Sequence, residues 1–186
     1  HDVQRIDRLV TEIAEASRID AELSRTQFVP VDLLGLARAL IAARDERGAN
    51  GDCRVRITTP DTGLLEVPGD AARLERVIEN LLDNAISFSP PGGAVIVELA
   101  RLDERIELCV SDEGPGIPAE AREQVFERFH SLRPPSEEFG SHSGLGLAIA
   151  RTIAEAHEGT LSARDRSDRK PGACLVLDLP ASEVDA

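Results

Sequence analysis

The first residues of the chain carry hydrophobic positions at helical spacing along a narrow seam. Val3, Ile6, Val10 and Ile13 recur every three or four residues, and most positions between them are polar or charged. A seam this narrow is typical of a coiled coil or helical bundle, although a helix that packs on its own domain gives a similar pattern. The periodicity ends near residue 27, where we place a domain boundary.

Beyond this boundary, helical and strand-like patterns alternate. We expect three amphipathic helices, from Asp32 to Gly48, from Asp70 to about Phe88 and from Leu145 to about Gly159. The alternating hydrophobic positions predict strands over residues 54–59, 64–67, 95–99, 106–110, 160–164 and 173–179. Hairpins combined with three such helices describe an α+β fold arranged as a two-layer sandwich.

Composition and charge narrow the class of ligand. The 186 residues carry a formal net charge of -13, which disfavours binding to a nucleic acid polymer or an anionic membrane. No apolar run reaches the roughly 18 residues of a membrane span, and the first residues lack the apolar segment of a signal peptide. Lys170 is the sole lysine, so any phosphate chemistry must work almost without lysine.

The three cysteines are far apart in the sequence. Cys53, Cys109 and Cys174 each fall in a strand-like run, where we expect small buried thiols. The absence of a Cys-x-x-Cys or Cys/His cluster makes a zinc site improbable. Three unpaired thiols fit a reducing cytoplasmic compartment.

The second predicted helix carries a polar row beside its hydrophobic stripe. Asn80, Asn84 and Phe88 follow one another at four-residue spacing and therefore share a face. A carboxamide offers an oxygen to Mg²⁺ and an N–H donor to phosphate oxygen. Ordinary surface polarity is the alternative interpretation of this row.

A second motif follows a predicted strand directly, with a carboxylate and then two glycines. Asp112 can accept a hydrogen bond from an exocyclic amine such as that of adenine. Gly114 and Gly116 permit close backbone approach to a flat ligand, and Ile117 follows them. A plain turn would have a similar composition.

A third, glycine-rich motif opens the third helix. Free N–H groups and the positive end of the dipole at such a helix N-terminus favour phosphate binding. The residues concerned are Ser143, Gly144, Leu145, Gly146 and Leu147. Because Ala148 and Ile149 follow instead of Lys and Ser or Thr, the motif is not a Walker A loop.

The order of these motifs, with Phe126 and Phe129 between the second and third, resembles the N, G1, F and G2 boxes of sensor histidine kinases. The resemblance covers roughly residues 28–180. It implies the Bergerat fold shared with gyrase, Hsp90 and MutL ATPases, in which three helices cover a mixed, mainly antiparallel sheet of about five strands. It also implies that residues 1–27 are the C-terminal part of the second helix of a dimerisation and phosphoacceptor hairpin. Residues 28–186 would then form the catalytic and ATP-binding domain, with a lid over about 118–143.

The resemblance assigns roles to individual residues. Asn84 matches the Mg²⁺ ligand, Asn80 a phosphate or metal-shell contact, and Phe88 a side chain against the nucleotide. Asp112 matches the carboxylate that reads adenine, while Gly114, Gly116 and Ile117 line that pocket. Phe126 and Phe129 match residues packed at the base of the lid, and residues 143–147 match the segment whose amides meet the phosphates.

Some positions depart from the family pattern. Ser87 stands where many relatives carry Lys or Arg, and His130 and Ser131 replace a common Tyr-Arg pair. Arg133, with Arg128 as a second candidate, could supply the missing positive charge near the transferred phosphoryl group.

The histidines do not supply a phosphoacceptor. None of them lies in the family's His-Glu/Asp-x-x-x-Pro setting; they are His1, His130, His142 and His157. His157 falls at a helix C-terminus, where a positive charge is favourable. Glu158 interrupts the family's His-Gly-Gly turn just after it.

These features predict a protein-histidine kinase domain that binds ATP and Mg²⁺ and phosphorylates a histidine on a helix missing from this chain. Its partners would be ATP and ADP, that acceptor helix in cis or trans, a second copy in the full-length homodimer, and a response regulator. We expect a cytoplasmic domain of a larger, membrane-anchored bacterial sensor.

Two other functions remain open. A gyrase-type ATPase would carry Glu four residues before the metal-binding Asn, where this chain has Asn80; Glu79 lies about 100° round the helix. A degenerate nucleotide-binding regulatory module is the second alternative, because Ser87 and Ser131 replace basic residues of the family.

Overall fold

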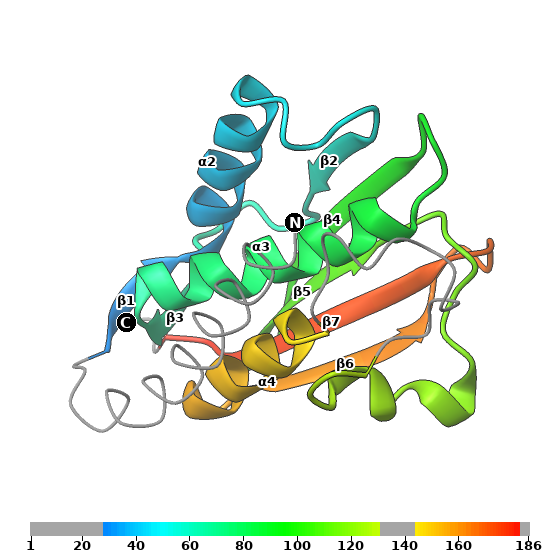
Figure 1. Cartoon of the computed structure of the whole chain (residues 1–186). Coiled ribbons are helices and arrows are strands. Elements are labelled where there is room, and N and C mark those ends of the chain that lie inside the picture. Colours follow the sequence, from blue (N-terminus) through cyan, green and yellow to red (C-terminus); the bar gives the residue numbers. More distant parts are fainter. Residues whose placement is uncertain (1–27, 131–143, 183–186) are drawn as a thin grey trace, which may run out of the picture.

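The computed structural model describes residues 28–130 and 144–182. Three helices lie on one face of a five-stranded sheet (Figure 1). The helices are α2 (Leu33–Glu46), α3 (Ala71–Phe88) and α4 (Gly146–Ala156). The sheet contains β2 (Arg54–Thr58), β4 (Ala94–Leu102), β5 (Arg105–Ser111), β7 (Ala173–Pro180) and β6 (Thr160–Asp165), in that spatial order. This arrangement confirms the predicted two-layer α+β fold.

The sheet is mixed and mainly antiparallel. β2 runs parallel to β4, and the β4–β5, β5–β7 and β7–β6 pairs are antiparallel. The alternating residues of its inner face are buried against the helices: Val95, Val97, Leu99, Ile106, Leu108, Val110, Leu175, Leu177 and Leu179. The hydrophobic stripe of α3, from Leu74 to Ala85, packs into the same core. The central helix is therefore fixed in rotation, which sets the direction of its polar row.

Helix ends occur where capping residues were predicted. Asp32 caps α2 by accepting a hydrogen bond from the Gly35 N–H at 3.0 Å. Asp70 caps α3 by accepting from the Arg73 N–H at 3.2 Å. α3 stops at Phe88, just before two prolines, as expected from the loss of N–H donors there. No helix of the described residues is long and apolar enough to cross a membrane.

A small second sheet was not predicted. β1 (Val29–Asp32) pairs antiparallel with β3 (Glu66–Gly69). The strand expected over 64–67 is shifted, because Leu64 is exposed and pairing begins at Glu66. Each strand has four residues and one partner, too short for a recognisable alternation.

The expectation of three unpaired thiols is wrong for two cysteines. Cys109 on β5 and Cys174 on β7 form a disulfide, and they cluster with Val176 apart from the main core. The register pairs Ser111 with Cys174 and Cys109 with Val176, so the two cysteines are diagonal neighbours. This pairing joins positions 65 residues apart, which local patterns do not reveal. Cys53 is free, and the argument for a reducing compartment loses its support from the other two.

Several predictions lie outside the described residues. These are the N-terminal helix with its two interpretations, Arg133, Ser143 and the second half of the predicted lid, residues 131–143. At the start of the predicted lid, the chain forms two short 3₁₀ helices, Ala119–Ala121 and Gln124–Phe126.

Candidate functional site

The three predicted motifs meet along α3. A Cβ placed on Gly146 would lie 3.2 Å from Oδ1 of Asn80, so the start of α4 rests against the first asparagine of the polar row. At the other end of the row, a Cβ on Gly114 would lie 2.7 Å from the carbonyl oxygen of Phe88. At Gly114 the backbone leaves no room for a Cβ, whereas at Gly146 a Cβ would press on the side chain of Asn80. The fold brings together residues that the sequence separates by up to 66 positions.

The amide of Asn80 is the clearest sign of a ligand site. Its Nδ2 atom is buried and has no hydrogen-bond partner within the described part of the chain. Leaving a buried donor unpaired costs about 1–3 kcal/mol, so such groups are rare unless a ligand completes them. Asn84 lies one turn further along α3 and is half-buried.

The N-terminus of α4 adds further donors at this end of the row. Leu145 occupies the N-cap position and has no side-chain oxygen with which to cap the helix. First-turn N–H groups that no cap engages favour an anion. Gly144 precedes the helix with a φ of 72° and accepts a hydrogen bond from the Phe129 N–H at 3.0 Å. This hydrogen bond ties the glycine turn to the segment that enters the predicted lid.

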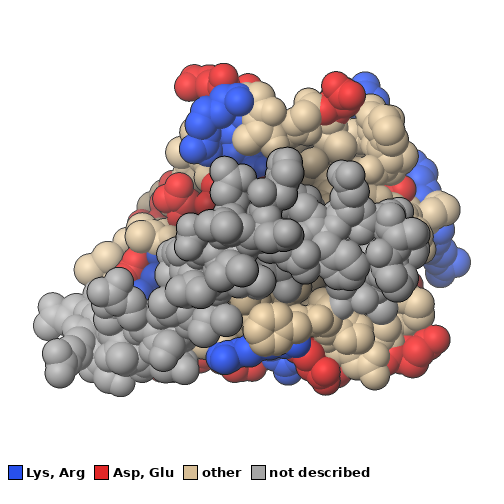
Figure 2. Space-filling model, in the orientation of Figure 1, with Lys and Arg blue, Asp and Glu red and all other residues tan. Residues whose placement is uncertain are grey.

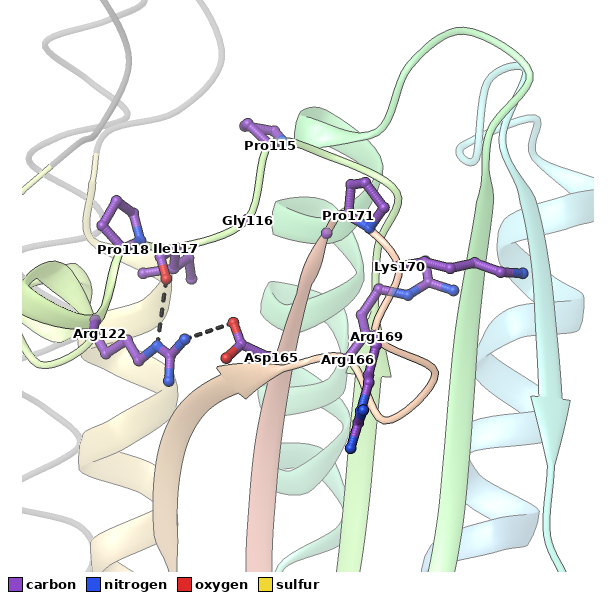
Figure 3. Close-up of a pocket in the computed structure, with 12 residues that line it drawn as sticks. Pro115, Gly116, Ile117, Pro118, Arg122, Asp165, Arg166, Arg169, Lys170 and Pro171 are labelled. Carbon is purple, nitrogen blue, oxygen red and sulfur yellow. Dashed lines mark hydrogen bonds and ion pairs between the residues drawn. The ribbon is translucent and has the colours of Figure 1, made fainter.

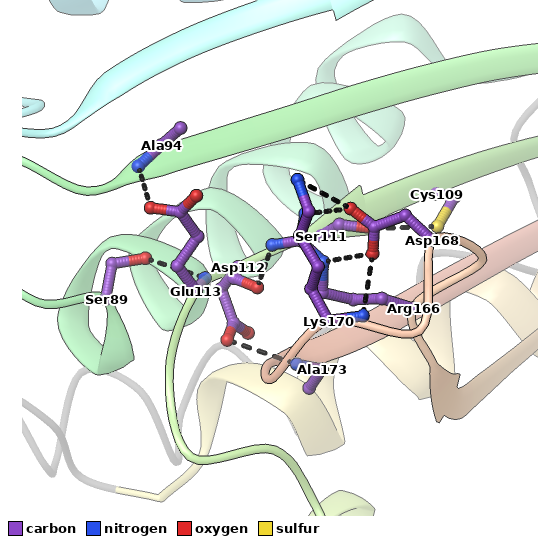
Figure 4. Close-up of polar contacts among 10 residues, drawn as sticks. All are labelled: Ser89, Ala94, Cys109, Ser111, Asp112, Glu113, Arg166, Asp168, Lys170 and Ala173. Carbon is purple, nitrogen blue, oxygen red and sulfur yellow. Dashed lines mark hydrogen bonds and ion pairs between the residues drawn. The ribbon is translucent and has the colours of Figure 1, made fainter.

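Asp112 lies at the opposite end of the row, directly after β5. The residue is only 3% exposed, and its Oδ1 atom accepts a hydrogen bond from the Gly114 N–H at 2.8 Å. The same atom accepts from the Ala173 N–H at 3.2 Å (Figure 4). Burial raises the pKa of this carboxyl group, while the two N–H donors and the charge of Arg166 oppose the rise. Two hydrogen bonds to one oxygen fix the orientation of the carboxylate.

The loop between β6 and β7 supports Asp112, which the sequence did not predict. Arg166 is buried, and its Nη1 donates to the Asp112 carbonyl oxygen at 2.8 Å. Gly172 packs so closely against that carbonyl that a Cβ has no room. From the sequence alone, the charged segment 166–170 predicts only an exposed turn between two strands. The glycine before β7 was the sole local sign that another backbone approaches there.

A separate open depression of about 650 Å³ lies between this loop and the segment that follows Gly114 (Figure 3). It is lined by residues 115–119, Arg122, Asp165, Arg166 and residues 169–172. Arg122 bridges its two walls by donating to the Ile117 carbonyl at 3.3 Å and to Asp165 at 2.6 Å. Asn80, Asn84 and Asp112 do not line this depression, so it is distinct from the row on α3.

One predicted side-chain placement is wrong. Phe126 is buried in the core as expected, but Phe129 is 60% exposed. Its backbone adopts a φ of 64°, which turns the chain toward Gly144 and directs the ring away from the core. Arg128, the second candidate for a phosphoryl contact, is also exposed.

His157 is neutral, against the expectation of a favourable positive charge. Its Nδ1–H donates to the Ile153 carbonyl at 2.7 Å, and its Nε2 accepts from the Asp70 N–H at 3.1 Å. The bond accepted by Nε2 requires a neutral ring, because both nitrogens of a charged imidazolium carry a proton, and burial lowers the pKa of the imidazole. The ring also stacks on Phe28 at 4.5 Å. A neutral imidazole, and not a positive charge, thus donates to the Ile153 carbonyl at the end of α4.

The charged residues of the described chain do not form another candidate site on the face drawn. Figure 2 shows their acidic and basic side chains interspersed along the rim of this face. Among the described residues, no group of three or more His, Cys, Asp or Glu side chains could hold a metal ion.

Known proteins share both the sequence and the fold. The chain is 44% identical over 191 residues to sensor protein ChvG of Rhizobium meliloti (strain 1021), covering 97% of this chain and 33% of that protein. It thus spans about a third of this curated relative. The structure of a mycobacterial sensor histidine kinase, MprB, superposes with a TM-score of 0.70 at 34% identity, covering 84% of this chain and 99% of that one. Full-length ShkA in complex with AMPPNP gives a TM-score of 0.79 at 25% identity, covering 98% of this chain and 37% of that one.

The family assignment follows from a match over more than half of the chain. The family described as histidine kinase-, DNA gyrase B-, and HSP90-like ATPase matches residues 69–183, which include α3, Asp112 and the start of α4. The chain therefore belongs to the histidine kinase-, DNA gyrase B- and HSP90-like ATPase family.

Proposed function

We propose that this chain is the catalytic part of a sensor histidine kinase and that it transfers the γ-phosphoryl group of ATP to a histidine on a separate phosphoacceptor helix. The observation that carries the proposal is the buried Nδ2 of Asn80 beside the N-terminus of α4, for which residues 28–130 and 144–182 supply no hydrogen-bond partner. Phe88 lies eight residues further along α3, a rise of about 12 Å. A nucleotide lying along α3 would have its phosphates at the Asn80 end and its base at the Phe88 end.

At the base end, Asp112 would accept a hydrogen bond from the exocyclic amine of adenine. Gly114 and Gly116 leave room for the flat ring, and Phe88 and Ile117 supply apolar contact, each being half-buried. The backbone hydrogen bonds to Oδ1 of Asp112 hold the carboxylate before the nucleotide arrives. Such preorganisation favours adenine over bases that lack this donor.

At the phosphate end, Asn80 would donate to a phosphate oxygen, together with backbone amides of residues 143–147. Asn84 is the residue that would hold Mg²⁺ through its carboxamide oxygen. A single protein oxygen suits this ion, which keeps several waters and binds substrate phosphates. When bound, Mg²⁺ neutralises charge on the phosphate oxygens during transfer. Arg133 is our candidate for a further positive charge at the transferred group.

The remaining partners follow from this assignment. The acceptor histidine and its neighbouring general base would lie on another helix, in cis or trans, within a homodimer. The phosphoryl group would then pass to a response regulator. We place the domain in the cytoplasmic part of a membrane-anchored sensor.

The structure gives a specific reason to prefer transfer over hydrolysis. Glu79 is the carboxylate nearest in sequence to the position where a gyrase-type ATPase has its general base. Its Oε1 atom lies 3.7 Å from Nη1 of Arg44 on α2, away from the α4 side of α3. Because Glu79 lies on this side of α3, a change of its side-chain rotamer would not bring its carboxylate to the phosphates of a nucleotide bound beside Asn80.

The test is phosphoryl transfer to a separate acceptor hairpin from the same kinase, with γ-labelled ATP and Mg²⁺. We expect the wild-type chain to label the hairpin and Asn84→Ala to abolish that labelling. Glu75→Ala, on the exposed side of α3, is the matched control and should retain it. ATP binding without labelling would favour the degenerate regulatory module, and rapid ATP hydrolysis without labelling would favour the ATPase.

A further inference from the structure

We propose that Arg166 is a positioning residue that sets the adenine selectivity of the site by holding the backbone of Asp112. The inference rests on the proposed function, because it concerns how the adenine-reading carboxylate is directed. Arg166 itself would touch no part of the nucleotide.

The guanidinium group of Arg166 is buried and fully oriented. The residue is 5% exposed, and its Nε and Nη2 atoms donate to the two carboxylate oxygens of Asp168 at 3.0 and 2.8 Å. Asp168 also accepts from the Lys170 N–H at 3.2 Å, which fixes it within the loop. The remaining nitrogen, Nη1, is thereby directed at the Asp112 carbonyl, 2.8 Å away (Figure 4).

The start of β7, directly after this loop, also holds Asp112. The Asp112 N–H donates to the Ala173 carbonyl at 3.0 Å, and the Ala173 N–H donates to Oδ1 of Asp112 at 3.2 Å. Arg166 adds a third hydrogen bond between these segments, at the carbonyl of Asp112. The N–H and one carboxylate oxygen of Asp112 are therefore bonded to Ala173, the first residue of β7, and its carbonyl is bonded to Arg166 in the loop before β7.

A purely structural role explains this arrangement less well. Burying a charged fork among polar partners contributes little net stability, since an apolar side chain of similar volume often serves as well. What the fork adds is geometry, because a planar guanidinium with two bonds to Asp168 can place its third donor in one direction only. That direction is the peptide that bears the adenine-reading carboxylate.

The experiment compares the affinities of ATP and inosine triphosphate, whose base has an oxygen where adenine has the exocyclic amine. Competition against a fluorescent ATP analogue with Mg²⁺ measures both. We expect Arg166→Gln to weaken ATP binding by roughly tenfold, because a buried acceptor loses its charged donor. Binding of inosine triphosphate, which makes no such bond to Asp112, should change less than twofold.

Two further variants sharpen the comparison. Arg169→Gln removes the same charge from the same loop at an exposed position and should leave both affinities unchanged. Arg166→Lys retains a donor but not the fork, so part of the selectivity for ATP should return. If Arg166→Gln does not fold by circular dichroism, Asp168→Asn, which releases the fork from one side, replaces it with the same expectation.

The outcomes are distinguishable. A parallel loss of both affinities, or no loss of ATP affinity, overturns the positioning role while leaving the proposed function intact. If the wild-type chain itself fails to prefer ATP over inosine triphosphate, the adenine assignment in the proposed function fails, and this inference fails with it.

Discussion

Replacing Asp112 by asparagine removes one negative charge from the buried base end of the site and hardly alters its shape. The Gly114 and Ala173 N–H groups both donate to Oδ1, so the amide oxygen of the variant must occupy that position. The amide nitrogen then replaces Oδ2 and presents N–H donors. Because the exocyclic amine of adenine is also a donor, the variant loses the hydrogen bond and gains an opposed pair.

The size of the loss follows from the type of bond. A hydrogen bond to a charged acceptor contributes about 1.5–3 kcal/mol, and here nothing replaces it. We therefore expect ATP to bind Asp112→Asn roughly 30- to 150-fold more weakly, the equivalent of about 2–3 kcal/mol.

The same change should raise the stability of the unliganded fold at neutral pH. Burial raises the pKa of Asp112 above the value of about 3.9 that it has in the unfolded chain. The wild-type fold therefore binds a proton more tightly than the unfolded chain does, and it loses stability as pH rises through the interval between the two pKa values. The variant does not titrate, so its advantage should be largest above the raised pKa and disappear below about pH 3.9.

Two measurements check this reasoning. Isothermal titration with ATP and Mg²⁺ gives the affinities, and urea unfolding at several pH values gives the difference in unfolding free energy. That difference should change by no more than about 1.4 kcal/mol per pH unit, because one proton is involved. Unchanged ATP affinity would refute the adenine assignment. If the stability advantage of the variant over the wild type is smaller at neutral pH than at acid pH, the argument from burial is refuted.

The other predictions concern the turn after α4. Burial lowers the pKa of His157 in the folded protein below its value of about 6.5 in the unfolded chain. The neutral ring therefore contributes stability above about pH 6.5. This stability is lost as pH falls, by up to about 1.4 kcal/mol per pH unit. In urea unfolding between pH 7.5 and 5.5, His157→Gln should lack this part of the slope; an identical slope would contradict the neutral ring. Glu158 has a φ of 57° and is exposed, so Glu158→Gly should raise the unfolding free energy by about 1 kcal/mol without changing ATP affinity. Glu158→Ala is the control, and an equal gain from it would show that backbone strain is not the cause.

Features decided within a few residues were predictable from the sequence. The caps at Asp32 and Asp70 bond to N–H groups three residues away, and the α3 stripe repeats at helical spacing. The alternation in β4 and β5 reports which face of each strand is buried, and the turn between them is short. Each of these features depends on residues that are close together in the sequence, so it can be recognised from the sequence alone.

Features decided by distant pairing were not predictable. β1 pairs with β3 across more than thirty residues, and Cys109 reaches Cys174 only because β5 and β7 are neighbours. Arg166 lies 54 positions from the carbonyl it contacts. No local periodicity distinguishes this arginine from an exposed one in a charged turn. The motifs therefore identified which residues belong to the candidate site, but not what holds them.

The two ends of the candidate site depend on different parts of the fold. Asp112 is held by β5, by the start of β7 and by the loop before it, whereas Asn80 and Gly146 meet where α3 packs on α4. The proposed base end thus consists of a carboxylate oriented by backbone and arginine, and the proposed phosphate end consists of neutral amides and a helix terminus. The chain has a net charge of -13 and one lysine, so its overall electrostatic potential does not attract anions. An anion is therefore bound best by N–H donors close to it, such as those of a carboxamide and a helix N-terminus. Separate supports at the two ends mean that base selectivity and phosphate chemistry can change independently, because the residues that fix one end share no hydrogen bond with those that fix the other in the described structure.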